Sequence, residues 1–463
     1  MTCRKLSPFL NFCCNKSPLS DEKMKVKILK RNAADFVRET KHDIHKIHRN
    51  YSQVEHPFEA EREYQRALNS VKLEKVFAKP FIGSLDGHRD GITCVTKHPG
   101  ALSTIASAAS DGEIRLWQLA NRTCSGSWQA HDGVIRGLTY TPSGDQILSC
   151  ADDKTIKTWD AEKVSNLPLD TVLCKHMVTG ISHAREGDQF ATCGENAQLW
   201  AAGRSVPLRT FQWGVDSVHL VKFNQVETNL LAAAASDNSI MLYDTRNVGP
   251  VRKVIMTLRS NALAWNPMEA MVFTTASEDY NLYSFDVRKL DRPVNVHMDH
   301  VGAVVDVDYS PTGREIVSGS YDKTIRIFRA SEGRSREVYH TKRMQRLTNV
   351  LWSNDDRYIV SGSDEMNLRL WKARASERLG IMKDRERVAL QYSEKLKEKY
   401  AQHPQISRIS RHRQVPKHIK NAQNELKTIR ASKSRKEANR RKHSKPGSVP
   451  YVPEREKNVV DEK

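Results

Sequence analysis

Short apolar runs recur through the middle of the chain, and each alternates apolar with polar residues before it ends in an aromatic side chain. ASDGEIRLW, ADDKTIKTW and SYDKTIRIF are three examples, in which a tight turn precedes the alternation. Alternation with a period of two predicts a β-strand that is buried on one face. The aromatic ends stand at seven positions: Trp117, Trp159, Trp200, Tyr243, Phe285, Phe328 and Trp371.

These aromatics lie 41 to 43 residues apart. The sixth residue before the aromatic is acidic in all repeats but the third, which has Gly194; the acids are Asp111, Asp153, Asp237, Asp279, Asp322 and Glu365. A period of about 40–45 residues with a terminal aromatic is typical of WD-type propeller blades, each a small antiparallel sheet. The predicted fold is therefore all-β: a seven-bladed WD-repeat β-propeller over residues 76–371.

The segment VFAKPFIGSL, residues 76–85, is apolar but has no blade of its own. An open ring of seven blades would leave an unpaired strand edge, which folded proteins usually avoid. We therefore predict that this segment supplies the outer strand of the seventh blade and closes the ring.

A histidine, a serine, an aspartate and a tryptophan recur together in the first two repeats. The two sets are His88, Ser107, Asp111 and Trp117, and His131, Ser149, Asp153 and Trp159. The first three residue types could form a nucleophilic triad. One active site would not repeat from blade to blade, so we predict a buried chain of hydrogen bonds instead. The blades that end in Phe285 or Phe328 lack the indole N–H, and we expect weaker chains there.

The flanking segments have helical periodicity. Residues 24–75 form a polar N-terminal arm, with short helices predicted at RNAADFVRET and FEAEREYQRALNSVKLEK. In the tail, residues 372–463, apolar side chains step by four and predict a helix that ends near His403-Pro404. A second helix is expected after Pro416. The apolar set of the first tail helix is Val388, Tyr392, Leu396 and Tyr400. Residues 1–23 fit neither pattern and are interpreted as an extension ahead of Met24.

Charge separates the same parts of the chain. The net charge is +19. Residues 85–371 hold 31 basic and 34 acidic residues, whereas the tail holds 26 basic and 11 acidic ones. A near-neutral globular part with basic ends favours contact with polyanions.

The strongest basic run lies in the predicted second tail helix. It comprises Lys433, Arg435, Lys436, Arg440, Arg441 and Lys442. A solvated or disordered charged segment, a nuclear localisation signal and direct contact with RNA phosphates remain open as interpretations, and the last two are compatible. Few aromatics interleave with the run, so base stacking is not predicted.

Several classes of protein fit poorly. The eight cysteines include no C-x-x-C pair, and the first residues lack a secretory h-region, which favours a reducing compartment and no metal site. No run approaches the ~18 apolar residues of a membrane span. Neither a cofactor nor a small-molecule substrate is predicted.

A specific resemblance adds to this pattern. WNPMEA, EDYNLYSFDVR, SGSDEMNLRLWKARASERLG and HSKPGSVP, in this order along residues 24–450, closely resemble the Sof family of WD-repeat proteins. That resemblance implies a place in the small-subunit processome of the nucleolus. It also implies association with the U-three snoRNP, pre-ribosomal RNA and other processome proteins, and a role in the cleavages that release 18S rRNA.

A second resemblance lies inside the repeats. YDTR and FDVR resemble the Asp-x-Arg box of substrate receptors for the cullin-four ubiquitin ligase. The matching residues are Asp244 with Arg246 and Asp286 with Arg288, while Tyr243 and Phe285 replace the tryptophan of that box. The alternative is that both arginines form salt bridges between blades.

Two functions follow, neither of them enzymatic. The first is a processome scaffold in 18S rRNA maturation, located in the nucleus and nucleolus. The second, which the same protein could also perform, is substrate reception for a cullin-four–RING ligase through binding of its adaptor.

Overall fold

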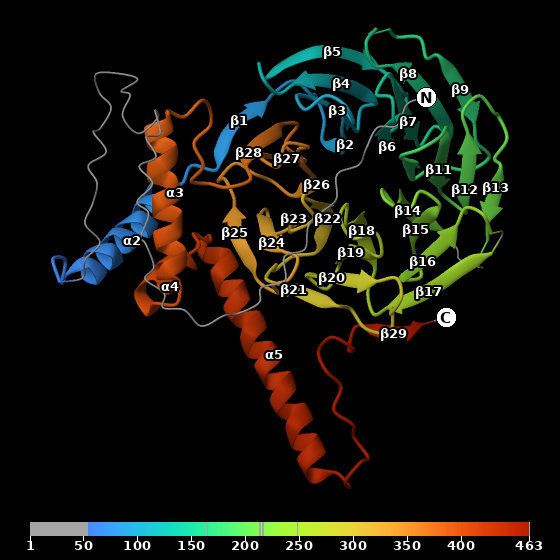
Figure 1. Ribbon diagram of the computed structural model, residues 1–463. Helices are drawn as coiled ribbons and strands as arrows, with labels where there is room; N and C mark the ends of the chain where they lie inside the picture. The colour runs from blue at the N-terminus through green and yellow to red at the C-terminus, as the bar shows by residue number, and fades with distance from the viewer. Residues whose placement is uncertain (1–53, 164, 213, 215–216, 248, 463) are drawn as a thin grey trace, which may run out of the picture.

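Seven antiparallel sheets surround a central axis in the computed structural model, which describes residues 54–463 except 164, 213, 215–216, 248 and 463 (Figure 1). This is the predicted seven-bladed propeller. Each blade contributes strands a to d from the axis outward. The predictions for residues 1–23 and for RNAADFVRET lie outside the described residues.

The strands of blades 1 to 3 are β2 (Ile92–Lys97), β3 (Thr104–Ala109), β4 (Glu113–Gln118), β5 (Thr123–Gln129), β6 (Ile135–Tyr140), β7 (Gln146–Ala151), β8 (Thr155–Asp160), β9 (Asp170–Leu173), β10 (Gly180–His183), β11 (Gln189–Cys193), β12 (Ala197–Ala201) and β13 (Arg209–Phe211). Those of blades 4 and 5 are β14 (Val218–Phe223), β15 (Leu230–Ala235), β16 (Ser239–Asp244), β17 (Pro250–Met256), β18 (Ser260–Trp265), β19 (Val272–Ser277), β20 (Asn281–Asp286) and β21 (Asn295–Met298). Blades 6 and 7 hold β22 (Val304–Tyr309), β23 (Glu315–Ser320), β24 (Ile325–Arg329), β25 (Ser335–Tyr339), β26 (Leu347–Trp352), β27 (Tyr358–Ser363), β28 (Leu368–Lys372) and β1 (Phe81–Leu85).

The ring closes as predicted, since β1 forms the outer strand of blade 7. It pairs antiparallel with β28, with Phe81 opposite Trp371 and Leu85 opposite Leu368. The strand is shorter than the predicted 76–85, because helix α2 (Glu59–Val76) continues to Val76 and a non-strand link follows.

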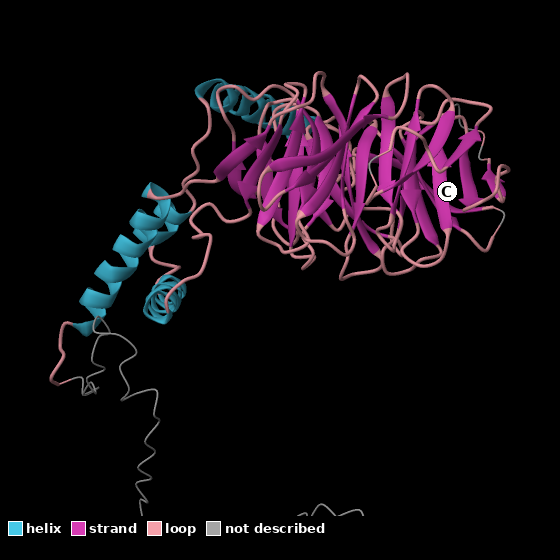
Figure 2. Ribbon diagram, turned by 90° about the horizontal axis from the view of Figure 1, so that it is seen from above, coloured by secondary structure: helices cyan, strands magenta, loops and turns pink. Residues whose placement is uncertain are grey.

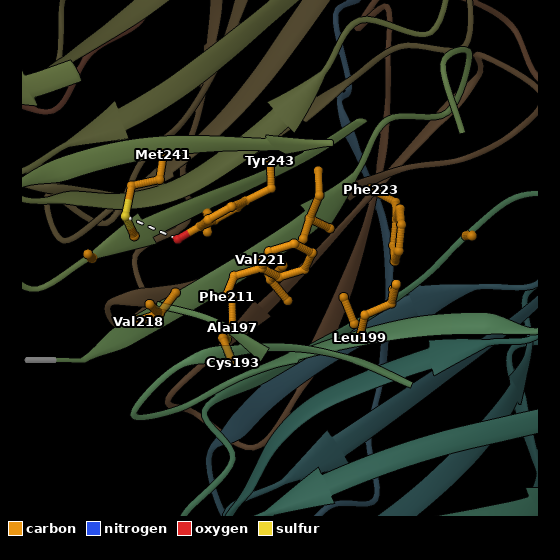
Figure 3. Close-up of a cluster of buried hydrophobic side chains, with 14 residues drawn as sticks. Cys193, Ala197, Leu199, Phe211, Val218, Val221, Phe223, Met241 and Tyr243 are labelled. Carbon is orange, nitrogen blue, oxygen red and sulfur yellow. Dashed lines mark hydrogen bonds between the residues drawn. The ribbon is translucent and has the colours of Figure 1, made fainter. Parts of the chain in front are cut away.

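The core lies between blades. Figure 3 shows one such cluster, where strands of blades 3 and 4 bring Leu199, Phe211 and Phe223 together with Tyr243. The Tyr243 hydroxyl, buried among these side chains, donates a hydrogen bond to the Met241 sulfur at 3.2 Å. Apolar burial of this kind is the main stabilising term in such a fold.

Three helices from both ends of the chain form one bundle beside blade 7 (Figure 1). They are α2, α3 (Asp384–Lys399) and α4 (Pro404–Ser410). Ala67, Leu68 and Val71 of α2 pack against Leu396 and Ile406 of the tail. The predicted apolar face of the tail helix is thus divided: Leu396 and Tyr400 contact α2, whereas Val388 is 61% exposed.

The ring has two flat faces, seen edge-on in Figure 2, and they carry different connections between strands. Because strands alternate in direction within a blade, b–c turns and d–a connections lie on one face, and a–b and c–d loops on the other. Helix α5 (Lys417–His443) lies against the first, which we call the helix face; the second is the loop face. The chain then returns, and strand β29 (Val459–Glu462) pairs with β17 of blade 4.

Candidate functional site

Helix α5 carries the predicted basic run. Pro416 precedes its first turn, as the sequence indicated, and its 27 residues include all six cations of the run. Five of the six side chains are exposed and Arg441 is half-buried. Since successive helical residues point in different directions, the run presents cations around most of the helix surface rather than along one stripe.

The helix is anchored at its N-terminal side to blades 5 and 6. Arg413 Nη1 lies 2.7 Å from Asp299 Oδ2, and Gln423 Nε2 donates to the Asp299 carbonyl at 2.8 Å. Further along, Arg430 Nη2 donates to Asn281 Oδ1 at 3.4 Å. These contacts fix the direction in which the basic run leaves the ring.

Asp299 is the centre of this anchor. Burial alone would raise the pKa of its carboxyl, but the hydrogen bond from Ser335 and the charges of Arg413 and Arg326 hold that pKa below its ordinary value. The carboxyl therefore stays ionised near neutral pH and holds Arg413 as an ion pair with little solvent access. Sequence analysis missed this pair, because Arg413 lies outside the two predicted tail helices, in the segment between them.

The return segment after α5 folds back along the basic run. Lys457 Nζ lies 2.9 Å from Glu437 Oε2, and the Arg441 guanidinium lies 4.8 Å from the centre of the Tyr451 ring. One cation of the run therefore already has an aromatic neighbour, whereas the other five remain open to solvent.

The two Asp-x-Arg boxes lie on the loop face, in the c–d loops of neighbouring blades 4 and 5. Each aspartate caps its own turn, since Asp244 Oδ1 accepts from the Arg246 amide at 2.9 Å and Asp286 Oδ1 from the Arg288 amide at 3.0 Å. Both arginine side chains are exposed. Within the described residues, neither guanidinium has a hydrogen bond or ion pair. The boxes therefore present two free guanidinium groups from adjacent blades.

Other arginines make the contacts between these blades. Arg209 of blade 3 donates to the Thr245 carbonyl at 2.7 Å, and Arg252 of blade 4 donates to the Arg288 carbonyl at 2.9 Å. The interpretation of Arg246 and Arg288 as inter-blade salt bridges thus finds no support in the described part of the chain. The blade-joining arginines come from outer strands.

Blade 2 contains the complete predicted hydrogen-bond chain. His131 Nε2 and Ser149 Oγ are 2.7 Å apart, His131 Nδ1 and Asp153 Oδ2 are 2.7 Å apart, and the Trp159 indole N–H donates to Ser149 at 2.9 Å. Burial lowers the pKa of His131 despite the nearby Asp153. The imidazole is therefore neutral near pH 7, donating to the carboxylate and accepting from the serine.

Blade 1 corrects the prediction in one place. His88 contacts Ser107 at 2.6 Å and Trp117 donates to the same hydroxyl at 2.8 Å. Asp111, however, only caps its own turn, by accepting from the Glu113 amide at 3.1 Å, and makes no hydrogen bond to His88. The nearest carboxylate to His88 is Glu113, at 3.8 Å, because Glu113 occupies the position after the turn that Thr155 holds in blade 2.

Blade 6 repeats the chain with a residue set that sequence analysis had only partly named. His300 contacts Asp322 at 2.9 Å and Ser318 at 2.7 Å, and Phe328 takes the place of the tryptophan without an N–H donor. In blades 3 and 7, Trp200 and Trp371 donate to Thr192 and Ser361 without a histidine of this kind. The spacing of His300, Ser318 and Asp322 matches that of blade 2 and could have identified the set.

Chemistry at these sets is blocked by burial. The side chains of His131 and His300 are fully buried, as are Ser149 and Ser318, so no substrate reaches the hydroxyls. A cavity of about 630 Å³ opens on the loop face near blades 5 to 7, and its lining residues include no histidine or cysteine. In the described residues no cluster of histidine, cysteine and acidic groups could hold a metal ion, and no helix is long and apolar enough to cross a membrane.

Comparison with known proteins places the chain. A Sof1-like domain model matches residues 373–459, and WD40 repeat models match 79–118, 122–160, 291–329 and 337–372. "DDB1- and CUL4-associated factor 13" of Danio rerio is 56% identical over 441 residues, which cover 94% of this chain and 99% of that protein. "Protein SOF1" of Saccharomyces cerevisiae is 45% identical over 465 residues, with 94% of each chain covered. The chain belongs to the Sof1-like WD-repeat family.

The residue ranges matched by the family models agree with the elements of the structure. The Sof1-like match spans α3, α4, α5 and the return segment, so this region continues from the last strand of the ring at Lys372. The WD40 matches fall on blades 1, 2, 6 and 7, and each of these blades contains the histidine–serine contact or its tryptophan counterpart with serine. A solved WD40 propeller domain of Doa1 has a TM-score of 0.55 at 20% identity, covering 63% of this chain and 96% of that one, and supports the fold alone.

Proposed function

We propose that this chain is a non-catalytic scaffold of the small-subunit processome in the nucleolus, where it binds pre-ribosomal RNA and the U-three snoRNP during maturation of 18S rRNA. Membership of the Sof1-like family along 94% of the chain supports the assignment. The observation that carries the RNA-binding part is the anchored helix α5. It holds exposed cations at a fixed direction from the ring, so phosphate contacts need little further ordering.

The basic run is the part to test. Replacing its six cations with glutamine, in a chain that carries an independent nuclear import signal, separates import from RNA contact. We expect reduced nucleolar accumulation, weaker crosslinking to pre-18S RNA, and binding in vitro whose dependence on salt concentration is shallower than that of the unaltered chain.

A matched control replaces six exposed cations elsewhere on the surface with glutamine. Suitable residues are Lys163, Lys175, Arg204, Arg259, Lys342 and Arg343. This control should keep both crosslinking and 18S maturation. If the α5 variant reaches the nucleolus and matures 18S rRNA normally, the run acts only in import and RNA contact by these residues is excluded.

A second function is favoured by the paired boxes. We propose that Arg246 and Arg288 bind carboxylates of the ligase adaptor; the vertebrate relatives are named for association with DDB1 and CUL4. Two exposed guanidinium groups on adjacent c–d loops can each form a forked, two-point bond to a carboxylate, which lysine cannot reproduce.

Changing Arg246 and Arg288 together to alanine tests this role. The ring should remain folded, because neither side chain makes a hydrogen bond or ion pair among the described residues. Adaptor recovery in a pull-down should fall at least about tenfold if each lost charge pair is desolvated in the complex. Arg204→Ala with Arg259→Ala, two exposed arginines outside the boxes, is the matched control. Equal recovery of the adaptor by both double variants would mean that the box arginines do not bind it and that the boxes have only a structural role.

A further inference from the structure

The fold brings one aromatic ring to the basic run, although the sequence separates the two. Tyr451 follows Arg441 by ten residues and lies in the segment between α5 and β29, which turns back toward the ring of blades (Figure 1). The Arg441 guanidinium lies over the Tyr451 ring, 4.8 Å from its centre. At this distance a cation is attracted to the face of an aromatic side chain. Base stacking, which the sequence of the run did not predict, is thus available to the folded tail.

The Tyr451 side chain is both open to solvent and held in place. It is 68% exposed, so much of the ring is uncovered. Pro450 and Pro453 restrict the backbone around it, because the proline ring fixes φ. Further along, Lys457 Nζ lies 2.9 Å from Glu437 Oε2, and β29 pairs with β17. The segment is therefore fastened to α5 and to blade 4, and a ligand that binds the ring requires little further ordering of the chain.

The surroundings of this ring are cationic. The hydrogen bond from Lys457 and the charges of Lys457, Arg441 and Lys433 lower the pKa of the Glu437 carboxyl, which places three cations around a single acid. Arg440, in the last turn of α5, is exposed as well. An open ring among cations suits a ligand that combines a flat apolar face with negative charge. Single-stranded RNA is such a ligand, whereas the bases of a duplex are already stacked inside the helix.

We propose that Tyr451 stacks an unpaired base of single-stranded RNA on the face opposite Arg441, while the cations of α5 bind the neighbouring phosphates. This inference rests on the first proposed function and adds the kind of RNA structure that is recognised, a single strand rather than a duplex. Every base has a flat π face, so stacking of this kind tolerates any sequence.

The test compares the full chain with its Tyr451→Ala variant on a non-pairing single strand of about ten nucleotides, a length within the range of single-strand sites. We expect the alanine variant to bind at least about fivefold more weakly. The dependence of affinity on salt should stay the same, because tyrosine carries no charge. Tyr451→Trp keeps a flat ring and should retain binding. Phe77→Ala, which removes an equally exposed ring (68%) at the end of α2, is the matched control and should bind normally.

Two further probes distinguish stacking from a displacement of the whole segment. On a strand of the same length that lacks bases, Tyr451→Ala should bind as well as the unaltered chain, because no base remains to be stacked. The same equality is expected on a duplex of the same sequence. An equal loss of affinity on the complete and the base-free strand would mean that the substitution moves the segment, and it would overturn the stacking role.

The outcomes also separate stacking from RNA binding itself. If the glutamine variant of the basic run loses single-strand binding whereas Tyr451→Ala keeps it, the stacking role is overturned and the RNA-binding function stands. If Tyr451→Ala keeps RNA binding but recovers fewer processome proteins, the ring contacts protein, which also overturns the proposal. If the unaltered chain binds none of the RNA probes, the RNA-binding function and the stacking role both fall.

Discussion

The aspartate before the b–c turn makes different hydrogen bonds in different blades, although it occupies the same position in each repeat. In blade 2, one oxygen of Asp153 accepts from the Thr155 amide and caps the b–c turn, and the other binds His131. The turn residue Lys154 has φ 62°, a left-handed conformation that such a cap helps to hold. Asp111 performs only the first of these roles.

Replacing each aspartate with alanine should separate the two roles. Asp153→Ala removes the turn cap and leaves buried His131 with one partner fewer, so we expect a loss of about 2–4 kcal/mol in the free energy of unfolding. Asp111→Ala removes the cap alone and should cost about 1 kcal/mol. Denaturant melts of both variants decide the matter, and equal losses would mean that the His131 bond contributes nothing.

Sequence spacing could predict the first residue set only in part. The offsets from His88 to Ser107 and Trp117 gave the correct contacts, because these residues sit at fixed positions on paired strands. The offset to Asp111 did not, since the carboxylate nearest His88 depends on the residue after the turn, Glu113. The repeat period does not reveal which of two neighbouring carboxylates lies closest to the histidine.

At the scale of elements, ring closure was predictable and the return of the tail was not. The apolar segment at residues 76–85 lay ahead of the first predicted blade, so its partner could be inferred from the open edge of blade 7. The β29 segment VVDE is four residues long and shows no alternation that separates it from a charged tail. The docking of α2 on α3 was hidden for another reason, because Val388 shares the face of Leu396 in sequence but not its burial.

The closing strand should be sensitive at its buried end. Leu85 is 1% exposed and packs with Ile92, Trp117 and Leu368, so Leu85→Ala should lower the free energy of unfolding by about 2–5 kcal/mol. Phe81 lies at the other end of the strand and is 43% exposed. Phe81→Ala should therefore cost less in the same thermal and denaturant melts. Equal effects of the two changes would contradict the closure argument.

At the scale of the whole molecule, the two flat faces have different charge chemistry. The helix face holds the anchored tail and its cations, and the loop face holds the paired box arginines. Because the ring separates them, the two partners proposed above would contact opposite faces of the molecule. The sequence predicted the residues of both surfaces, but their placement on opposite faces depends on how strands a to d are ordered.

Buried histidines spread around the ring should make its stability depend on pH. Burial lowers the pKa of His88, His219 and His297 to about 4, from an ordinary value near 6.5. Between these two values the unfolded chain binds more protons, so acid favours unfolding. The stabilisation is fully present above about pH 6.5 and is lost as the pH falls toward 4.

Thermal midpoints between pH 7.5 and pH 5 measure this effect. We expect the midpoint to fall steadily below pH 6.5, and the fall to be shallower in His297→Gln, which removes one of the three groups. A midpoint that rises on acidification would contradict the assignment of neutral buried imidazoles.

The joining of the two ends of the propeller also sets an order of events during synthesis. Phe81 pairs with Trp371, about 290 residues later, and among the described residues the apolar face of α2 packs on helices that follow that strand. At roughly 5–20 residues per second, translation leaves α2 and β1 without their partners for about 15–60 s. During that time, the apolar side chains Leu68, Val71 and Leu85 lack the partners that bury them in the folded protein, so this early-made segment has the apolar surface that chaperones at the ribosome recognise.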